Sequence, residues 1–387
     1  MDRVSDDAPA PTTPRSRARP AIGDVIDGTY EITGLLGEGG TGIVYDAMLG
    51  TKAVALKVIH GHLLSDRQIR GRFAREAKIL RRLSGPHLCP VLEFGEVADS
   101  SQDGTSLLYL ALEKVKGRAL DQILREEGPP ALPRVYDILL QILDALASAH
   151  AQGVIHRDLK PANVLLEDDA KVVVVDFGMA KIMTGAGSGG TTELTQHNMV
   201  FGTPEYMAPE QARGDELDAR CDVYAVGMIL YELLVGEVPF KASTPLGVLT
   251  AQLTAEPVPP RDKAPERNIP PALSAIVIHA LAKDPEARYP SAIAFASALR
   301  SAKETPNDVA AVSPSHFGRQ SLMHAPTVPA PEPNGPSKPT PVPVRASVRT
   351  PAPPTIVVKP ASKLLWVALW IGAVAIGIAI GVWLSLR

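Results

Sequence analysis

Residues 156–178 constrain the fold of this chain more than any other stretch of its sequence. Two acids in it, Asp158 and Asp176, lie 18 residues apart, and an amide, Asn163, follows the first acid by five positions. The apolar residues between them predict a short strand. Two carboxylates and an amide around one strand are the groups that a site needs to hold a metal-bound triphosphate and to orient a hydroxyl against it.

The composition indicates a folded protein without a general attraction to nucleic acid. The chain has 387 residues, of which 45% are hydrophobic and 21% charged, which is enough for two or three domain-sized units. Its formal net charge is −3, so we expect no nucleic-acid partner. Cys89 and Cys221 lie far apart without metal-ligand spacing, and we expect both in the core of a protein that folds in a reducing compartment.

A glycine-rich segment at 37–42 lies between two runs of alternating apolar residues, at 30–36 and 43–47, which predict a hairpin. Gly37, Gly39 and Gly42 would let backbone N–H groups approach phosphate oxygens. Dinucleotide-binding folds use the same glycine pattern, but a helix follows it there, with an acid about 20 residues on. Here a strand follows, which favours a loop that covers a nucleotide. The sequence has no Walker-type P-loop, which excludes that class of NTPase.

The strand predicted at 53–59 carries Lys57 in the middle of an apolar run. A buried lysine is costly unless an anion pairs with it. A lysine on the wet face of an edge strand is the alternative. The helical pattern at 70–83 that follows contains Glu76, which we expect to be the partner of Lys57.

Strands are predicted at 91–97 and 107–112, and helices at 133–152 and 223–235. The residues at 113–117 form a connector between the strand-rich half and the helical half. We expect the boundary between two lobes there, with Leu112 at the back of a nucleotide pocket.

Taken together, these motifs resemble the catalytic domain of Hanks-type protein kinases, in the form found in bacterial membrane-associated Ser/Thr kinases. They are the glycine segment, the lysine strand, the HRD-type triplet at 156–158 with Asn163, and the DFG triplet at 176–178. The resemblance covers residues 28–300. It implies a bilobal α+β fold with a small β-rich N-lobe at 28–114 and a larger helical C-lobe at 115–300.

The resemblance also implies a role for each site residue. Asp158 would be the catalytic base for a Ser or Thr hydroxyl of a protein substrate, and Lys160 would steady the γ-phosphate of ATP. Asn163 and Asp176 would hold two Mg²⁺ ions, while Phe177 would pack under the helix that carries Glu76. Lys57 would hold the α- and β-phosphates. The nucleotide-binding residues implied are Gly37, Gly39, Gly42, Val44, Ala55, Lys57, Glu113, Val115 and Leu165.

Two segments predict substrate class and regulation. The residues at 158–163 and 202–210 have the form typical of Ser/Thr kinases rather than tyrosine kinases. Thr203 would bond Asp158 and Lys160 as part of the substrate shelf, although alone it is an ordinary turn residue before proline. Thr191, Thr192 and Thr195 are candidate autophosphorylation sites whose phosphate would pair with Arg157. An unmodified loop is the alternative.

Two further contacts are expected within the large lobe. Asp222 precedes the apolar helix at 223–235, and we expect its carboxylate to brace the backbone near His156. By the resemblance, Arg288 pairs with Glu210 in a structural ion pair.

The ends of the chain differ in composition from the middle. Residues 1–27 predict a disordered tail, and the proline-rich residues 301–362 predict a semi-rigid linker, with binding to an aromatic groove as the alternative. Residues 364–384 carry no charge and predict one transmembrane helix with the positive flank, and therefore the kinase domain, on the cytoplasmic side of the inner membrane. Gly377 and Gly381 permit a homodimer through this helix, and no extracellular sensor domain is expected.

The sequence thus predicts a membrane-anchored bacterial Ser/Thr protein kinase that uses ATP and Mg²⁺. A rival from another class is a catalytically idle membrane scaffold that binds nucleotide. A third interpretation is a small-molecule phosphotransferase, which has no reason to carry the segment at 203–210.

Overall fold

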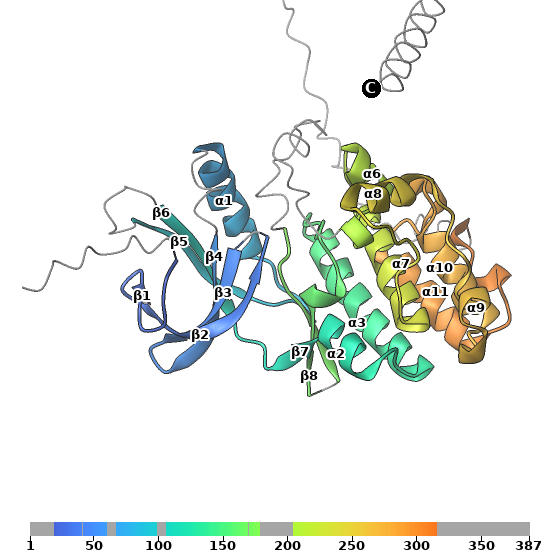
Figure 1. The fold of residues 1–387 in the computed structure, drawn as a ribbon, viewed down its shortest axis with the longest axis horizontal. Helices are drawn as coiled ribbons and strands as arrows, with labels where there is room; N and C mark the ends of the chain where they lie inside the picture. Colours follow the sequence, from blue (N-terminus) through green and yellow to red (C-terminus); the bar gives the residue numbers. More distant parts are fainter. Residues whose placement is uncertain are drawn as a thin grey trace, which may run out of the picture. The chain divides into compact units, whose positions relative to one another are not determined.

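The computed structural model describes residues 19–40, 42–59, 67–98, 106–168, 170–178 and 204–315. All of them belong to one compact unit. Figure 1 shows a strand-rich small lobe followed by a helical large lobe, which is the arrangement that the sequence predicts.

The small lobe is an antiparallel sheet with the strand order β1-β2-β3-β4-β6-β5, next to one helix, α1 (Figure 1). The predicted hairpin, lysine strand and later strands are all confirmed. The predicted helix at 70–83 forms, but it starts three residues earlier and ends three residues earlier. The elements are β1 (Val25–Ile26), β2 (Tyr30–Gly39), β3 (Gly42–Leu49), β4 (Lys52–Ile59), α1 (Arg67–Leu80), β5 (Val91–Ala98) and β6 (Ser106–Glu113).

The large lobe is built around two long apolar helices, α3 and α7. In α3 the buried side chains recur at helical spacing, whereas α7 is buried on nearly every side, as expected for a helix at the centre of a core. A small sheet, β7-β8-β9, belongs to this lobe: β7 precedes α2 and α3 in the chain, and β8 and β9 follow them. The elements are β7 (Gly117–Ala119), α2 (Leu120–Glu127), α3 (Leu132–Ala151), β8 (Val164–Glu167), β9 (Lys171–Val174), α6 (Pro209–Arg213), α7 (Arg220–Val235), α8 (Pro245–Thr254), α9 (Pro260–Lys263), α10 (Pro271–Ala280) and α11 (Ala292–Glu304).

The buried apolar side chains form two separate clusters. We call the larger one the shared core, because it joins Ile59, Leu110 and Phe73 of the small lobe to the helices of the large lobe. The smaller one, the outer core, lies within the small lobe and contains Tyr30 and Tyr109, whose ring centroids are 5.4 Å apart. Because side chains alternate along a strand, the sheet supplies both clusters from its two faces.

The folded unit is longer at both ends than the sequence predicts. Residues 19–27 belong to the predicted tail, but β1 forms within them and pairs with β2. At the other end the predicted domain stops at residue 300, yet α11 continues to Glu304. Beyond it the carbonyl of Pro306 accepts a hydrogen bond from Ala272 N at 2.9 Å, and the carbonyl of Val312 accepts one from Tyr289 Oη at 2.6 Å.

The predicted transmembrane helix at 364–384 and most of the predicted linker at 301–362 lie outside the described residues. Within the part of the chain that the structure describes, no helix is both long enough and apolar enough to cross a membrane.

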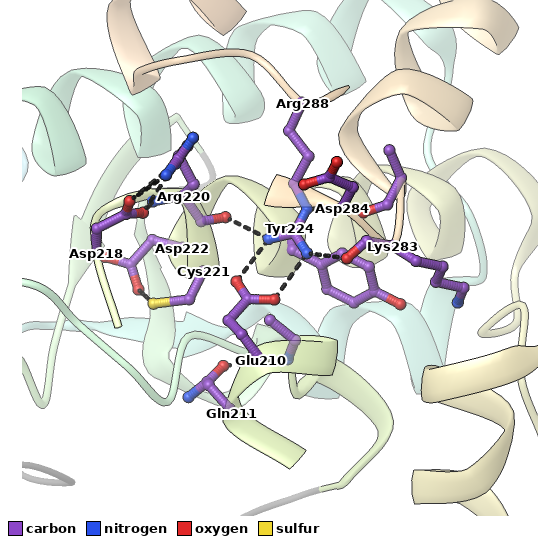
Figure 2. A network of polar contacts seen from close by, with 12 residues as sticks. Glu210, Gln211, Asp218, Arg220, Cys221, Asp222, Tyr224, Lys283, Asp284 and Arg288 are labelled. Atoms are coloured by element: carbon purple, nitrogen blue, oxygen red, sulfur yellow. Dashed lines mark hydrogen bonds and ion pairs between the residues drawn. The ribbon is translucent and has the colours of Figure 1, made fainter. Parts of the chain in front are cut away.

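A buried ion pair ties the helices of the large lobe together, as the sequence predicts. Arg288 donates through both terminal nitrogens to Glu210, at 2.6 and 2.7 Å, and both side chains are almost fully buried. Figure 2 shows the guanidinium between Glu210 and the backbone carbonyls of Arg220 and Lys283, to which it also donates. The fork geometry satisfies the charge on each side, which a buried pair requires.

Candidate active site

One face of the small-lobe sheet carries the predicted nucleotide-binding side chains. Val44 lies directly opposite Lys57 in the β3–β4 pairing, so the two share a face, and Ala55 shares it because it lies two positions from Lys57. Gly37 and Gly39 belong to the end of β2, and Gly42 opens β3. Three of the predicted nucleotide-binding side chains therefore share one face of the sheet, and the three glycines lie in the hairpin that forms part of it.

Lys57 is buried, as expected from its position in an apolar strand, with 4% of its surface exposed. Its Nζ lies 2.8 Å from Asp176 Oδ2, in an ion pair that joins the two lobes. Burial is the largest single influence and raises the pKa of the Asp176 carboxyl. The charge and hydrogen bond of Lys57, together with the nearby His156 and Lys160, outweigh burial, and the net pKa is lowered. The carboxylate is therefore held ionised beside the lysine.

The sequence predicts Glu76 as the partner of Lys57, and the ion pair described at Lys57 is instead with Asp176. Glu76 is half-buried on α1 and has an interaction of its own. A buried cation pairs with the carboxylate that packs against it, and at Lys57 that carboxylate belongs to Asp176.

The catalytic-loop residues converge around a single turn. Asn163 Nδ2 donates to the carbonyl of Asp158 at 2.7 Å, and Lys160 Nζ lies 3.2 Å from Asp158 Oδ2. The carbonyl of Asn163 accepts from Val175 N at 3.0 Å, which ties the turn to the residue before Asp176. These bonds join Asn163 to Asp158 and to the residue before Asp176, and the Asp158 side chain is one-third exposed, at 33%.

The backbone of the site is strained at two residues. Arg157 and Asp176 have φ angles of 68° and 65°, in the left-handed region that residues other than glycine rarely adopt. The strain at Arg157 is opposed by Asp222, which accepts hydrogen bonds from the backbone N–H groups of His156 and Arg157 at 2.8 and 2.9 Å. This is the bracing that the sequence predicts.

Asp222 is itself buried and held as an anion. His150 Nε2 lies 2.7 Å from its Oδ2. Burial is the largest single influence and raises the pKa of the Asp222 carboxyl. The hydrogen bond and charge of His150, together with His156 and the backbone N–H of Arg157, outweigh burial, and the net pKa is lowered. The sequence offers no spacing signal for the contribution of His150, which lies 72 residues away on α3.

Phe177 packs between the two lobes. Its ring centroid is 4.6 Å from that of His156, and it lines a small cavity together with Leu80 of α1. The same cavity is lined by Leu112, as predicted for the back of a nucleotide pocket, and by Lys57, Asp176 and Cys89. Cys89, which the sequence places in the core, thus lies at the site, and burial followed by the charge of Asp176 raises the pKa of its thiol to about 12.

The connector between the lobes carries the remaining predicted nucleotide contacts. Glu113 ends β6, with its N–H bonded to the carbonyl of Pro90 at 3.0 Å, and Val115 follows two residues later. Leu165 lies on β8, opposite Ala119. Lys114, between Glu113 and Val115, forms an ion pair with Asp46 of β3 at 2.7 Å, a contact that no sequence pattern indicates.

Gln252 of α8 anchors the segment after residue 203. Its Nε2 donates to the carbonyls of Pro204 and Glu205, at 3.3 and 2.6 Å, and its Oε1 accepts from Tyr224 of α7. The side chain is fully buried. A glutamine inside an apolar helical pattern is the signal that could have found it, because a buried amide requires partners. Thr191, Thr192, Thr195 and Thr203 lie outside the described residues.

A model of the protein kinase domain matches residues 30–299. The serine/threonine-protein kinase pkn3 of Myxococcus xanthus is 44% identical over 285 residues, which are 72% of this chain and 51% of that protein. The chain therefore spans about half the length of this relative.

Two solved structures share the fold. The kinase domain of Mycobacterium tuberculosis PknI superposes with a TM-score of 0.55 and 28% identity, over 73% of this chain and 98% of that one. A crystal structure of Rad53 in complex with AMP-PNP gives a TM-score of 0.56 and 25% identity, over 69% of this chain and 64% of that one. With the family model matching most of the chain, and with the motif residues gathered at one site, the chain belongs to the protein kinase domain family.

Proposed function

We propose that the chain is a serine/threonine protein kinase that transfers the γ-phosphate of ATP to Ser and Thr hydroxyls of proteins. The observation that carries this proposal is the convergence of Asp158, Asn163 and the Lys57–Asp176 pair from segments up to 119 residues apart. Membership in the kinase family supports ATP as the donor, and the Rad53 neighbour was solved with the nucleotide analogue AMP-PNP.

In this proposal the residues of the catalytic loop act on the substrate hydroxyl and on the phosphoryl group. Asp158 accepts the proton of the substrate hydroxyl as the hydroxyl oxygen attacks the γ-phosphorus, and the bond from that phosphorus to its bridging oxygen breaks, releasing ADP. The carboxylate is partly exposed, so a substrate can reach it. Lys160, 3.2 Å away, supplies positive charge to the phosphoryl group in transfer.

The donor set of the site fits Mg²⁺. The amide nitrogen of Asn163 is used in its bond to Asp158, so the amide oxygen is the atom that a cation would bind. Asp176 is held ionised and supplies carboxylate oxygens. Carboxylate and amide oxygens are ligands that Mg²⁺ accepts, and when bound the ion would neutralise charge on the phosphates.

We further propose that phosphate on Thr191, Thr192 or Thr195 switches the enzyme through Arg157. The Nε of Arg157 is buried and has no hydrogen-bond partner among the described residues. A buried guanidinium nitrogen without a partner favours an anionic group that would complete its bonds. Autophosphorylation of the loop would supply that anion.

Residues 364–384 are proposed to anchor the kinase to the inner membrane, with the catalytic unit on the cytoplasmic side. The support is in the sequence, which has 21 uncharged residues there, with Trp366 and Trp383 near the ends and Lys359 and Lys363 before them. Gly377 and Gly381 lie four residues apart, which permits two copies to pair.

The test is phosphate transfer by the full chain, purified in detergent, with ATP and casein as a generic protein substrate. Asp158→Asn should lower kcat by about 10²- to 10⁴-fold, because the base is lost, and should leave ATP affinity within about threefold. Nucleotide binding without transfer by the unmutated chain would favour the membrane scaffold instead.

Asp168→Asn is the matched control. It makes the same chemical change on an exposed residue ten positions along, at a φ of 46° that asparagine tolerates well. Transfer should remain at the wild-type rate. Equal loss in both variants would contradict the assignment of Asp158.

A further inference from the structure

The residues that precede the matched kinase domain run back along the glycine-rich hairpin. The family match begins at residue 30, and the structure describes the chain from residue 19. Gly23 N donates to the carbonyl of Ile32 at 2.8 Å, and Ile32 N donates to the carbonyl of Asp24 at 2.9 Å. These two bonds and the β1–β2 pairing fasten the segment 19–29 to the sheet.

Two contacts then bring Arg19 to the glycine-rich turn. The carbonyl of Pro20 accepts a hydrogen bond from the Tyr45 hydroxyl at 3.1 Å, and Tyr45 is a buried residue of β3. The Arg19 guanidinium forms a fork on Glu38, with its two terminal nitrogens 3.1 and 2.8 Å from the two carboxylate oxygens. A fork of this kind fixes the direction of both groups.

Glu38 is the only charged residue of the segment 37–42. Gly37, Gly39 and Gly40 have no atoms within 4 Å of the position that a Cβ would occupy, so no side chain fills the space beside the hairpin there. The backbone of 37–39 pairs with 42–44 of β3. The Glu38 side chain adds a contact from this end of the hairpin to a residue 19 positions earlier in the chain.

We propose that Arg19 is a positioning residue for the nucleotide, acting through Glu38. It holds the glycine-rich turn in place and neutralises a carboxylate that would otherwise repel the triphosphate of ATP. Charges within a Debye length, about 8 Å at physiological salt, interact appreciably even when exposed. This inference rests on the proposed use of ATP and adds a residue outside the matched kinase domain.

The test measures KM for ATP and kcat in the full chain, together with the affinity for a fluorescent ADP analogue, which needs no transfer. Exposed ion pairs contribute about 0.2–1 kcal/mol. Arg19→Ala should therefore raise both KM for ATP and the Kd of the analogue by about 2- to 5-fold, with kcat unchanged within about twofold. Arg19→Lys should recover part of the affinity, because it keeps the charge but loses the fork.

The decisive comparison uses a second background. In Glu38→Gln, where no carboxylate is left to hold or neutralise, adding Arg19→Ala should change KM by less than about 1.5-fold. High salt should narrow the difference between wild type and Arg19→Ala. The same effect of Arg19→Ala in both backgrounds, or none in the wild type, would overturn the proposal.

Arg81→Ala is the control variant. Arg81 pairs with Glu93 at 3.1 Å, with side-chain exposures of 52% and 43%, against 62% and 43% for Arg19 and Glu38. It should leave nucleotide affinity unchanged. If the wild type binds the analogue but transfers no phosphate, the kinase proposal fails while the Arg19 effect on affinity is still measurable, so the two failures are distinguishable.

Discussion

Asp222 accepts a hydrogen bond from the backbone N–H of His156 at 2.8 Å, across 66 positions of sequence. The same carboxylate accepts from the next N–H and contacts His150, so one buried side chain sets the course of the backbone directly before Asp158. The catalytic loop is therefore positioned from α7, an element with no predicted contact to substrate.

Asp222→Ala should lower both stability and activity. It leaves two backbone N–H groups without their acceptor, at about 1–3 kcal/mol for each buried group. The free energy of unfolding in urea should fall by at least about 2 kcal/mol, and kcat should fall more than KM rises. Asp222→Asn keeps one acceptor oxygen and should lose less. Equal free energies of unfolding and equal kcat values for wild type and Asp222→Ala would contradict the bracing role.

Breaking the pair between Arg288 and Glu210 should cost more than any surface ion pair. Arg288→Ala strands a buried carboxylate and should lower the free energy of unfolding by about 3–5 kcal/mol. The double variant Arg288→Met with Glu210→Leu removes both charges and should recover part of that loss. Urea denaturation measures both. A loss below about 0.5 kcal/mol in Arg288→Ala would show that the pair is not buried as described.

Two glycines of the glycine-rich hairpin should respond differently to the same substitution. A Cβ on Gly42 would lie 2.2 Å from the backbone oxygen of Val58, whereas a Cβ on Gly40 would have nothing within 4 Å. Gly42→Ala should therefore force β3 away from β4, lower the unfolding free energy by about 1–3 kcal/mol and raise KM for ATP. Gly40→Ala is the matched control and should stay within about 1 kcal/mol. A reversed order would contradict the strand pairing.

His279 should make stability depend on pH. Burial lowers the pKa of its imidazole, although a bond with the Val312 backbone acts in the opposite direction. The unfolded chain then binds the proton more tightly than the folded one, so stability is complete above the unfolded value near 6.5 and is lost as pH falls below it. Urea midpoints between pH 5 and 7.5 should show this loss.

His279→Gln removes the titrating group and should flatten that part of the curve, whatever its effect on stability at pH 7.5. His87→Gln removes another half-buried histidine, much earlier in the chain, and serves as the comparison. A curve that keeps its slope in His279→Gln would assign the pH dependence to other groups.

Lys57 shows what could be predicted from the sequence and what could not. A lysine within an apolar strand predicts burial and an acidic partner, and the structure confirms both. The choice between Glu76 and Asp176 depends on how α1 sits against β9 and the residues after it. Periodicity determines which face of a helix is buried, but not the position of that helix against a distant strand, so the sequence does not indicate the pair with Asp176, and Glu76 stays a prediction.

Arg19 illustrates a second limit. The sequence places it in a tail of low apolar content, which predicts disorder, and no local pattern links it to Glu38. The link arises because the two residues of β1 add to the edge of the sheet and turn the preceding chain back toward the hairpin. A strand of two residues is too short for any periodicity, so it could not be predicted.

The separation of the outer core from the shared core has a consequence for how the molecule opens. Hydrogen exchange reports local openings with free energies below that of global unfolding. At one edge of the sheet the outer core is covered by β1, a strand of two residues, and it can open there while the shared core stays intact. Slow, cooperative exchange is therefore expected for the backbone amides of α3, α7 and the small-lobe residues of the shared core. The shared core makes the two lobes one folding unit rather than two.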